Sequence, residues 1–181
     1  MSGIPYPEDG IPFDTYVVRI PRPADLEQIA PAFLDPAVGG EAGLPPLDRD
    51  GLLAFHDNEM RGLIESGAMI PLLIEDTETG TIVGGASIGH HEPTRQRVEI
   101  GYWLLEEARG RGIATKVARV LAEHVLAHGI ERVEAVARVE NVNSQRVLER
   151  AGFTREGVLR SLLRHDGRRC DAVIYSLLQG E

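Results

Sequence analysis

Apolar positions along this chain follow strand-like and helical spacings in turn. Residues 15–20 form a short run rich in β-branched side chains, which is typical of a strand. From Pro23 to residue 34 the apolar positions recur at helical spacing. A second helical pattern begins after the candidate N-cap Asp48 and ends near Gly67. Between the two helices, residues 35–47 contain three Pro and three Gly, which predicts a loop of a length often used for function.

The remainder of the chain is expected to hold six strands and two more helices. The strand-like runs span residues 69–74, 81–88, 98–105, 133–139, 158–163 and 171–178. Helical patterns span about residues 112–128 and 144–151, and each is followed by a glycine that can end a helix. The order of these elements predicts a mixed α/β (α+β) domain with a strand, a helix and a strand in succession at its centre.

Composition narrows the class of protein. A chain of 181 residues with 43% apolar side chains can bury one core without disulfides or metal. Cys170 is the single cysteine, so a disulfide framework and a cysteine-rich zinc site are excluded and no metal is expected. No apolar run reaches the ~20 residues of a membrane span, and residues 1–14 do not resemble a secretory signal. We therefore expect a cytoplasmic protein with an N-terminal extension, residues 1–14, and a single domain, residues 15–181.

Charge is unevenly distributed along the chain. The net charge of −9 argues against nucleic acid as a partner, because binding to phosphates needs clustered Lys and Arg. Residues 1–60 carry eleven Asp and Glu against three Arg, a net of −8. Residues 141–170 carry seven Arg against three Asp and Glu, a net of +4. An acidic region can attract a cationic ligand and a basic region an anionic one, although both patterns can also serve solubility alone.

The segment richest in chemistry is residues 99–114, with the sequence EIGYWLLEEARGRGIA. A predicted strand leads into a turn with two glycines, and a helix begins at about Gly112. The first N–H groups of a helix have no internal partners, and the helix dipole adds positive potential there. This pattern suits the binding of a pyrophosphate. The alternative is an ordinary helix start, with glycine for close packing and arginine for solubility.

Several segments resemble one family. Residues 109–114, RGRGIA, are similar to the acetyl-CoA pyrophosphate loop of the GCN5-related N-acetyltransferases (GNAT family). Residues 99–104 and 141–153 resemble segments of the branch named for the ribosomal-protein N-terminal acetyltransferases (RimJ/RimL-like), and residues 18–25 and 156–178 resemble its opening and close. The resemblance implies a GNAT fold: a central mixed, mostly antiparallel sheet with flanking helices. In that fold the strands at residues 99–104 and 133–139 splay apart.

The resemblance also implies a cofactor and the residues that bind it. Acetyl-CoA would be the cosubstrate, and its acetyl group would pass directly to a primary amine. Backbone amides of the glycine loop would hold the pyrophosphate, the end of the preceding strand would meet the pantetheine arm, and asparagines after the next strand would reach the thiol. The implied cofactor-binding residues are Leu104, Leu105, Arg109, Gly110, Arg111, Gly112, Ile113, Ala114, Thr115, Asn141 and Asn143.

Two residues are candidates for catalysis. Glu99 could accept the amine proton if burial raises its pKa; otherwise it is an outward polar residue or a partner for an arginine. Ser144 could donate a proton or a hydrogen bond to the leaving sulfur, or it could cap the following helix. Leu148 stands where many family members carry a tyrosine acid. Tyr102 and Trp103 could line the acceptor pocket or belong to the core.

The acceptor is not specified by these patterns. It could be a small amine, a protein N-terminus or a lysine side chain. Residues 35–57 are expected to form the acceptor wall, and their acidic side chains favour a cationic acceptor. A non-catalytic acyl-CoA sensor is the alternative function, and a homodimer is compatible with the sequence. Residues 85–89 match the G-x-S-x-G pattern of hydrolases, but no helix follows the serine, so a strand of small residues is predicted instead.

Overall fold

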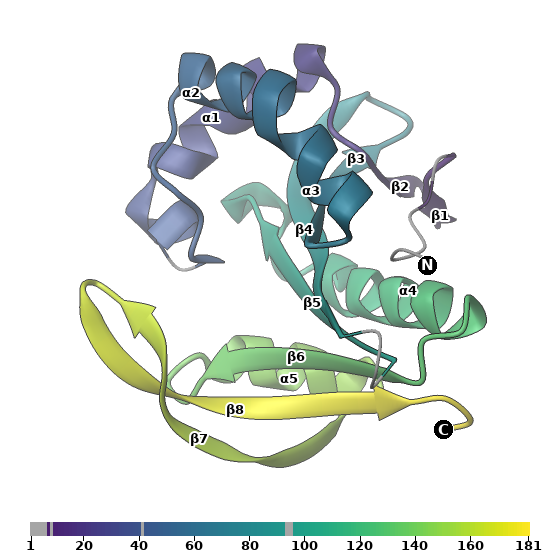
Figure 1. Cartoon of the computed structure of the whole chain (residues 1–181). Coiled ribbons are helices and arrows are strands. Elements are labelled where there is room, and N and C mark those ends of the chain that lie inside the picture. The colour runs from purple at the N-terminus through teal and green to yellow at the C-terminus, as the bar shows by residue number, and fades with distance from the viewer. Residues whose placement is uncertain (1–6, 8, 41, 93–95) are drawn as a thin grey trace.

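The computed structural model describes residues 7, 9–40, 42–92 and 96–181, and its centre is one mixed sheet (Figure 1). The strands are β1 (Ile11–Phe13), β2 (Tyr16–Arg19), β3 (Met69–Asp76), β4 (Thr81–Glu92), β5 (Arg97–Leu104), β6 (Arg132–Arg138), β7 (Thr154–His165) and β8 (Arg168–Leu178). They lie in the order β1-β2-β3-β4-β5-β6-β8-β7. The β5–β6 pair is parallel and the other neighbouring pairs are antiparallel. The predicted mixed, mostly antiparallel sheet is therefore confirmed.

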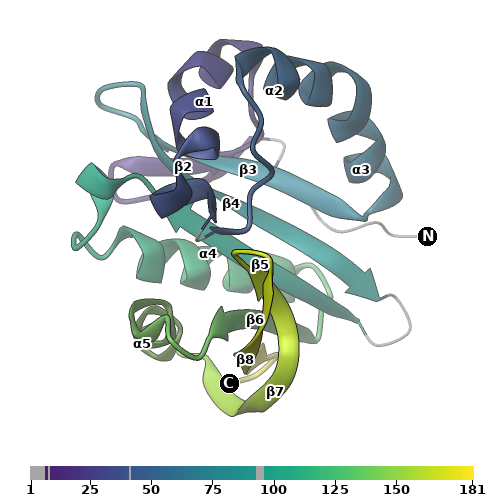
Figure 2. The ribbon, with the colours of Figure 1, turned by 90° about the vertical axis from the view of Figure 1, so that its left-hand side faces the viewer.

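Helices cover both faces of this sheet (Figure 2). They are α1 (Leu26–Leu34), α2 (Arg49–Phe55), α3 (Arg61–Ser66), α4 (Ile113–Ala127) and α5 (Val142–Arg150). Helices α1 to α3 lie on one side of β2 to β5, and α4 lies on the other side, where it contacts β5 and β6. Helix α5 packs against α4, β6 and β7.

Every predicted strand and helix is present, with shifted ends. The helix expected over residues 48–67 is α2 and α3 joined by a π-helical turn, His56–Met60. Asp48 caps it as predicted, since its side chain accepts a hydrogen bond of 2.8 Å from Gly51 N. Strand β1 was not predicted, because three residues are too few to show an alternating pattern and its order comes from pairing with β2.

The core lies mainly between the sheet and α4. Most of the apolar stripe that predicted α4 is fully buried there, including Val117, Leu121 and Val125, whereas Val120 is partly buried. A smaller apolar cluster under α1 and α2 includes Leu26 and Leu52 and packs against Trp103. The two clusters pack against opposite faces of β5, so the position of the end of this strand is fixed by packing.

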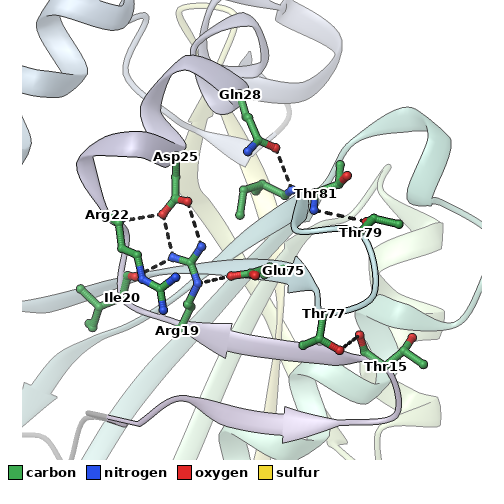
Figure 3. A network of polar contacts seen from close by, with 11 residues as sticks. Thr15, Arg19, Ile20, Arg22, Asp25, Gln28, Glu75, Thr77, Thr79 and Thr81 are labelled. Carbon is green, nitrogen blue, oxygen red and sulfur yellow. Dashed lines mark hydrogen bonds and ion pairs between the residues drawn. The ribbon is translucent and has the colours of Figure 1, made fainter.

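A buried ionic network joins β2, β3 and the start of α1 (Figure 3). The Arg19 guanidinium donates to both carboxylate oxygens of Asp25, at 2.7 and 2.8 Å, and also donates to Glu75. The pKa of Asp25 is lowered overall. Burial alone would raise it, but the hydrogen bonds from Arg19 and from the backbone of Arg22 have a larger combined effect in the opposite direction. Arg19 and Asp25 therefore lock the first strand of the predicted domain to its first helix.

Strands β5 and β6 separate after a short parallel contact. They pair only at Arg97–Arg132, Val98–Val133 and Glu99–Glu134. From there β5 stays with β4 as far as Leu104, whereas β6 stays with β8 (Figure 1). The predicted splay is thus confirmed, and it begins beside Glu99.

Small residues in β4 allow the neighbouring strand to approach closely. A Cβ atom on Gly85 would lie 2.5 Å from the indole nitrogen of Trp103. The G-x-S-x-G stretch lies entirely within β4, as predicted, and its first glycine makes room for Trp103.

Candidate active site

Two adjoining cavities open where β5 and β6 separate. The first has a volume of about 610 Å³ and is lined by the glycine loop, the start of α4 and one face of α5. The second has a volume of about 450 Å³ and is lined by β5, β6, the β7–β8 hairpin and residues near α3. Residues Ala42, Tyr102, Asn141 and Ser144 line both cavities. We call this shared wall the junction.

The glycine loop presents backbone amides to the first cavity. Gly110 and Gly112 have φ of +75° and +78°, a left-handed conformation that favours glycine. The first α-helical bond of α4 runs from Lys116 N to Gly112 O at 3.3 Å. The N–H groups of residues 113–115 therefore precede the helical hydrogen-bond ladder, and all three residues line the cavity. Together with the helix dipole they form an anion site.

The Arg109 side chain connects the glycine loop to two neighbouring backbone segments. Its Nε donates to the Leu104 carbonyl oxygen at 3.2 Å, and its guanidinium also donates to the Ala37 carbonyl oxygen at 3.2 Å. Leu104 and Arg109 both line the first cavity. Arg109 thus ties the end of β5 to the loop that follows α1.

Two of the residues implied as cofactor ligands have other partners. The Arg111 side chain donates to the Tyr16 hydroxyl at 2.8 Å and lies 6.0 Å from that ring's centre. The N–H of Leu105 donates to the Val83 carbonyl oxygen at 3.0 Å. Neither residue lines either of the two cavities, so we leave both out of the proposed cofactor site. The nine others, Leu104, Arg109, Gly110, Gly112, Ile113, Ala114, Thr115, Asn141 and Asn143, line the first cavity.

The start of α5 places Ser144 at the junction. Asn141 is the N-cap, and its side-chain oxygen accepts a hydrogen bond of 3.0 Å from Ser144 N. The helix is therefore capped by Asn141, and Ser144 does not have the capping role that was its alternative to catalysis. The Ser144 hydroxyl lies instead 3.0 Å from the Tyr102 hydroxyl, which is also 3.3 Å from the Ser144 carbonyl oxygen. Burial raises the pKa of Tyr102 to about 12, although its hydrogen bond with Ser144 acts in the opposite direction.

Glu99 lies at the point where the two strands part. It is partly buried, stands beside Glu134 in the parallel register and lines the second cavity but not the first. Glu134 is buried and accepts hydrogen bonds from Arg97 and, at 2.7 Å, from Arg132. Glu134 therefore binds arginines within the sheet, whereas its neighbour Glu99 lines the second cavity.

The first cavity has basic residues that the sequence analysis did not select. Arg146 and Arg150 line it together with Asn143 and Val147, all on one face of α5. Their spacing of three, four and seven residues is the signal that could have identified them. They place two cations on the wall of the cavity that holds the anion site.

Residues 35–57, the expected acidic acceptor wall, line the two cavities only in part, and none of their described carboxylates does so. Glu41, the fifth carboxylate of this segment, lies outside the described residues. The side chains of Asp35, Asp48, Asp50 and Asp57 line neither cavity. The loop after α1 contributes small residues instead, including Gly40 and Ala42. These four carboxylates were expected at the acceptor because of their place in the chain, but in the structure all four are exposed and lie apart from the cavity walls.

Neither a metal centre nor a membrane-spanning helix is found in the described part of the chain. Among the described residues, no group of three or more His, Cys, Asp or Glu side chains could hold a metal ion. Within the same residues, no helix combines the length and the apolar character needed to cross a membrane.

Comparisons with known proteins agree on one family. A sequence profile described as "Acetyltransferase (GNAT) domain" matches residues 16–154. The uncharacterized N-acetyltransferase YoaA of Bacillus subtilis is 34% identical over 169 residues, which are 92% of this chain and 94% of YoaA. YdaF of Bacillus subtilis, a putative ribosomal N-acetyltransferase, is 37% identical over 103 residues, and the alignment spans 56% of each chain. The solved structure of RimJ from Mycobacterium smegmatis, in complex with CoA-disulfide, superposes with a TM-score of 0.80 at 26% identity and covers 90% of this chain and 81% of RimJ.

Proposed function

Because this chain belongs to the acetyltransferase (GNAT) family, we propose that it transfers the acetyl group of acetyl-CoA directly to the primary amine of an acceptor. The observation that carries the proposal is the junction. One cavity has an anion-binding loop, the other has a carboxylate, and the two meet at a pair of hydroxyl groups. A two-substrate transfer needs such an arrangement, because each substrate enters separately and the reacting atoms must meet.

In this proposal acetyl-CoA occupies the first cavity. Its pyrophosphate binds the N–H groups of residues 113–115, and Arg146 and Arg150 add positive charge on the facing wall. Its pantetheine arm runs along the end of β5, where pairing with β6 has ceased and the strand edge is open. The solved structure of RimJ in complex with CoA-disulfide supports this class of ligand.

Residues at the junction and on the wall of the second cavity supply the steps of acyl transfer. Glu99 accepts the proton of the amine, directly or through water, in the second cavity. A backbone N–H of β5 near residues 102–104 polarises the thioester carbonyl. The amine nitrogen then bonds to the carbonyl carbon, the carbon–sulfur bond breaks, and its electron pair stays on sulfur beside Ser144.

The second cavity takes the acceptor amine. Its volume of about 450 Å³ accommodates a small amine or the first residue of a protein chain. Described carboxylate and arginine residues on its wall are Glu99, Arg138 and Arg164, so the wall carries charges of both signs. Both acceptor classes, small amines and protein N-termini or lysines, therefore belong in the test.

The test is a thiol-release screen with acetyl-CoA over small amines, amino acids and peptides. We expect thiol release that depends on the amine, with acetylated product seen by mass spectrometry. Glu99→Gln should lower kcat by about 10²- to 10⁴-fold, because it removes the proton acceptor but keeps the shape. A wild-type protein that binds acetyl-CoA and releases no thiol with any amine would be a sensor, and the proposed enzyme function would be wrong.

A further inference from the structure

Two hydroxyl groups from distant parts of the chain meet at the junction. Tyr102 comes from β5 and Ser144 from α5, 42 positions later, and their oxygens are 3.0 Å apart. Both residues line both cavities. The pair therefore lies where an acyl group passing from one cavity to the other must come.

The geometry allows either hydroxyl to donate, and we assign Tyr102 as the donor from the relative acidities of the two groups. A phenol is a stronger acid than an alkyl hydroxyl, so it is the better donor and the serine oxygen the better acceptor. The contact of Tyr102 with Ser144 Oγ, at 3.0 Å, is also shorter than its contact with the Ser144 carbonyl oxygen, at 3.3 Å. With Tyr102 as donor, the hydrogen of Ser144 is left to point into the cavity.

The helix cap leaves this serine hydroxyl available. Asn141 already accepts the Ser144 N–H, so the helix start does not require the serine side chain. A hydroxyl that accepts one hydrogen bond becomes a stronger donor for the next, because the two bonds polarise each other.

We propose that Tyr102 is a positioning residue that donates its hydrogen bond to Ser144 and so directs the Ser144 O–H at the sulfur of the leaving CoA. This inference rests on the proposed function and adds a second residue to its leaving-group step. The pair stabilises the thiolate without giving up a proton.

Relative acidities support a hydrogen bond rather than a proton relay. The pKa of Tyr102, raised by burial to about 12, lies well above the ~8.5 of an ordinary thiol. Transfer of the phenol proton to the thiolate is therefore uphill. The proton that finally reaches sulfur is the one Glu99 removed from the amine, or one from water, so both hydroxyl groups end the step as they began it.

The first test measures the pKa of the CoA thiol in the binary complex, from the ultraviolet absorbance of the thiolate. This measurement needs no acceptor, so it stands even if acetyl transfer is not observed. We expect Tyr102→Phe and Ser144→Ala each to weaken the acidity of the bound thiol by about ten- to a hundredfold, the size of one hydrogen bond to a charged group. The double variant should match Ser144→Ala alone, because Tyr102 acts only through Ser144.

The second test measures transfer with an acceptor found in the screen. Tyr102→Phe should lower kcat by about ten- to a hundredfold and leave the KM for acetyl-CoA within about twofold. Tyr175→Phe is the matched control, because it removes another tyrosine hydroxyl, which donates to Glu149 at 3.1 Å, from a residue that lines neither cavity. It should keep both the wild-type kcat and the wild-type thiol pKa.

Two outcomes overturn the inference. One is a Tyr102→Phe protein with wild-type thiol pKa and kcat. The other is additive losses in the double variant, which would mean that Tyr102 acts through packing and not through Ser144. A third outcome separates this inference from the proposed function. If the wild-type protein lowers the pKa of the bound CoA thiol but transfers no acetyl group, the proposed function is rejected and the hydroxyl pair remains a thiolate-binding site.

Discussion

Replacing Gly112 with alanine tests the anion site at the start of α4. Gly112 has a φ of +78°, and a Cβ atom there would meet nothing within 4 Å. The penalty is therefore one of backbone conformation and not of space, at about 1–2 kcal/mol for a non-glycine residue in the left-handed region. A loop that changes conformation to avoid this backbone strain turns the N–H groups of residues 113–115 away from the cavity.

The expected loss of affinity follows from the number of amides displaced. A hydrogen bond to a charged group contributes about 1.5–3 kcal/mol, and each 1.4 kcal/mol is a factor of ten in Kd. Loss of one such bond should weaken CoA binding by about ten- to a hundredfold, as measured by calorimetry. Binding of pantetheine, which lacks the pyrophosphate, should change little.

Gly129→Ala is the matched control for this variant. Gly129 follows the other end of the same helix, has a φ of +92° and likewise meets nothing within 4 Å. Both variants should lose about 1–2 kcal/mol of unfolding free energy in urea, but only Gly112→Ala should lose CoA affinity. Wild-type CoA affinity in Gly112→Ala, or an equal loss in Gly129→Ala, would refute the assignment of the anion site.

Three further changes test other parts of the account. Arg19→Met leaves the carboxylates of Asp25 and Glu75 without their shared cation and should cost about 3–5 kcal/mol of unfolding free energy; a loss under 1 kcal/mol would contradict the buried network. Hydrogen bonds from Arg132 and Ser176 lower the pKa of Glu156 from 4.5 to about 2, so its stabilisation is present above pH 4.5 and lost as the pH falls toward 2. In Glu156→Gln the urea midpoint should therefore fall less between pH 6 and pH 3 than in the wild type, and equal falls would show that the pair contributes nothing. Arg150→Ala should raise the KM for acetyl-CoA about threefold at low salt and less at high salt, because exposed charges are screened; a salt-independent change would argue against an electrostatic role.

The parts of the site that the sequence predicted are the local ones. Three features of the site are set by residues within a few positions of each other. They are the left-handed glycines, the first amides of the helix and its apolar stripe. The loop at residues 109–115 and helix α4 could therefore be placed from the order of residues alone. The element order and the family resemblance supplied the splayed strands around them.

The parts that the sequence did not predict depend on contacts between distant segments. Arg111 binds Tyr16, 95 positions away, and so leaves the cavity that its neighbours line. Tyr102 meets Ser144 only because β5 and α5 are packed beside the same gap. Charge counted along the chain favoured carboxylates such as Asp48 and Asp57 at the acceptor wall, but both are exposed and line neither cavity. Spacing along the chain carries no information on such pairings until the sheet order is known.

The central claim is that the sulfur of CoA lies at the junction, next to Ser144. The most direct measurement is disulfide capture: Ser144→Cys is incubated with oxidised CoA, and the intact mass is recorded before and after reduction. The account predicts one CoA adduct, which excess acetyl-CoA, a competitor without a free thiol, suppresses and which a second change, Gly112→Ala, slows. The wild-type protein serves as the control, since its Cys170 lies in β8 and lines neither cavity. An unmodified Ser144→Cys protein, or equal capture by Cys170 in the wild type, would contradict the account.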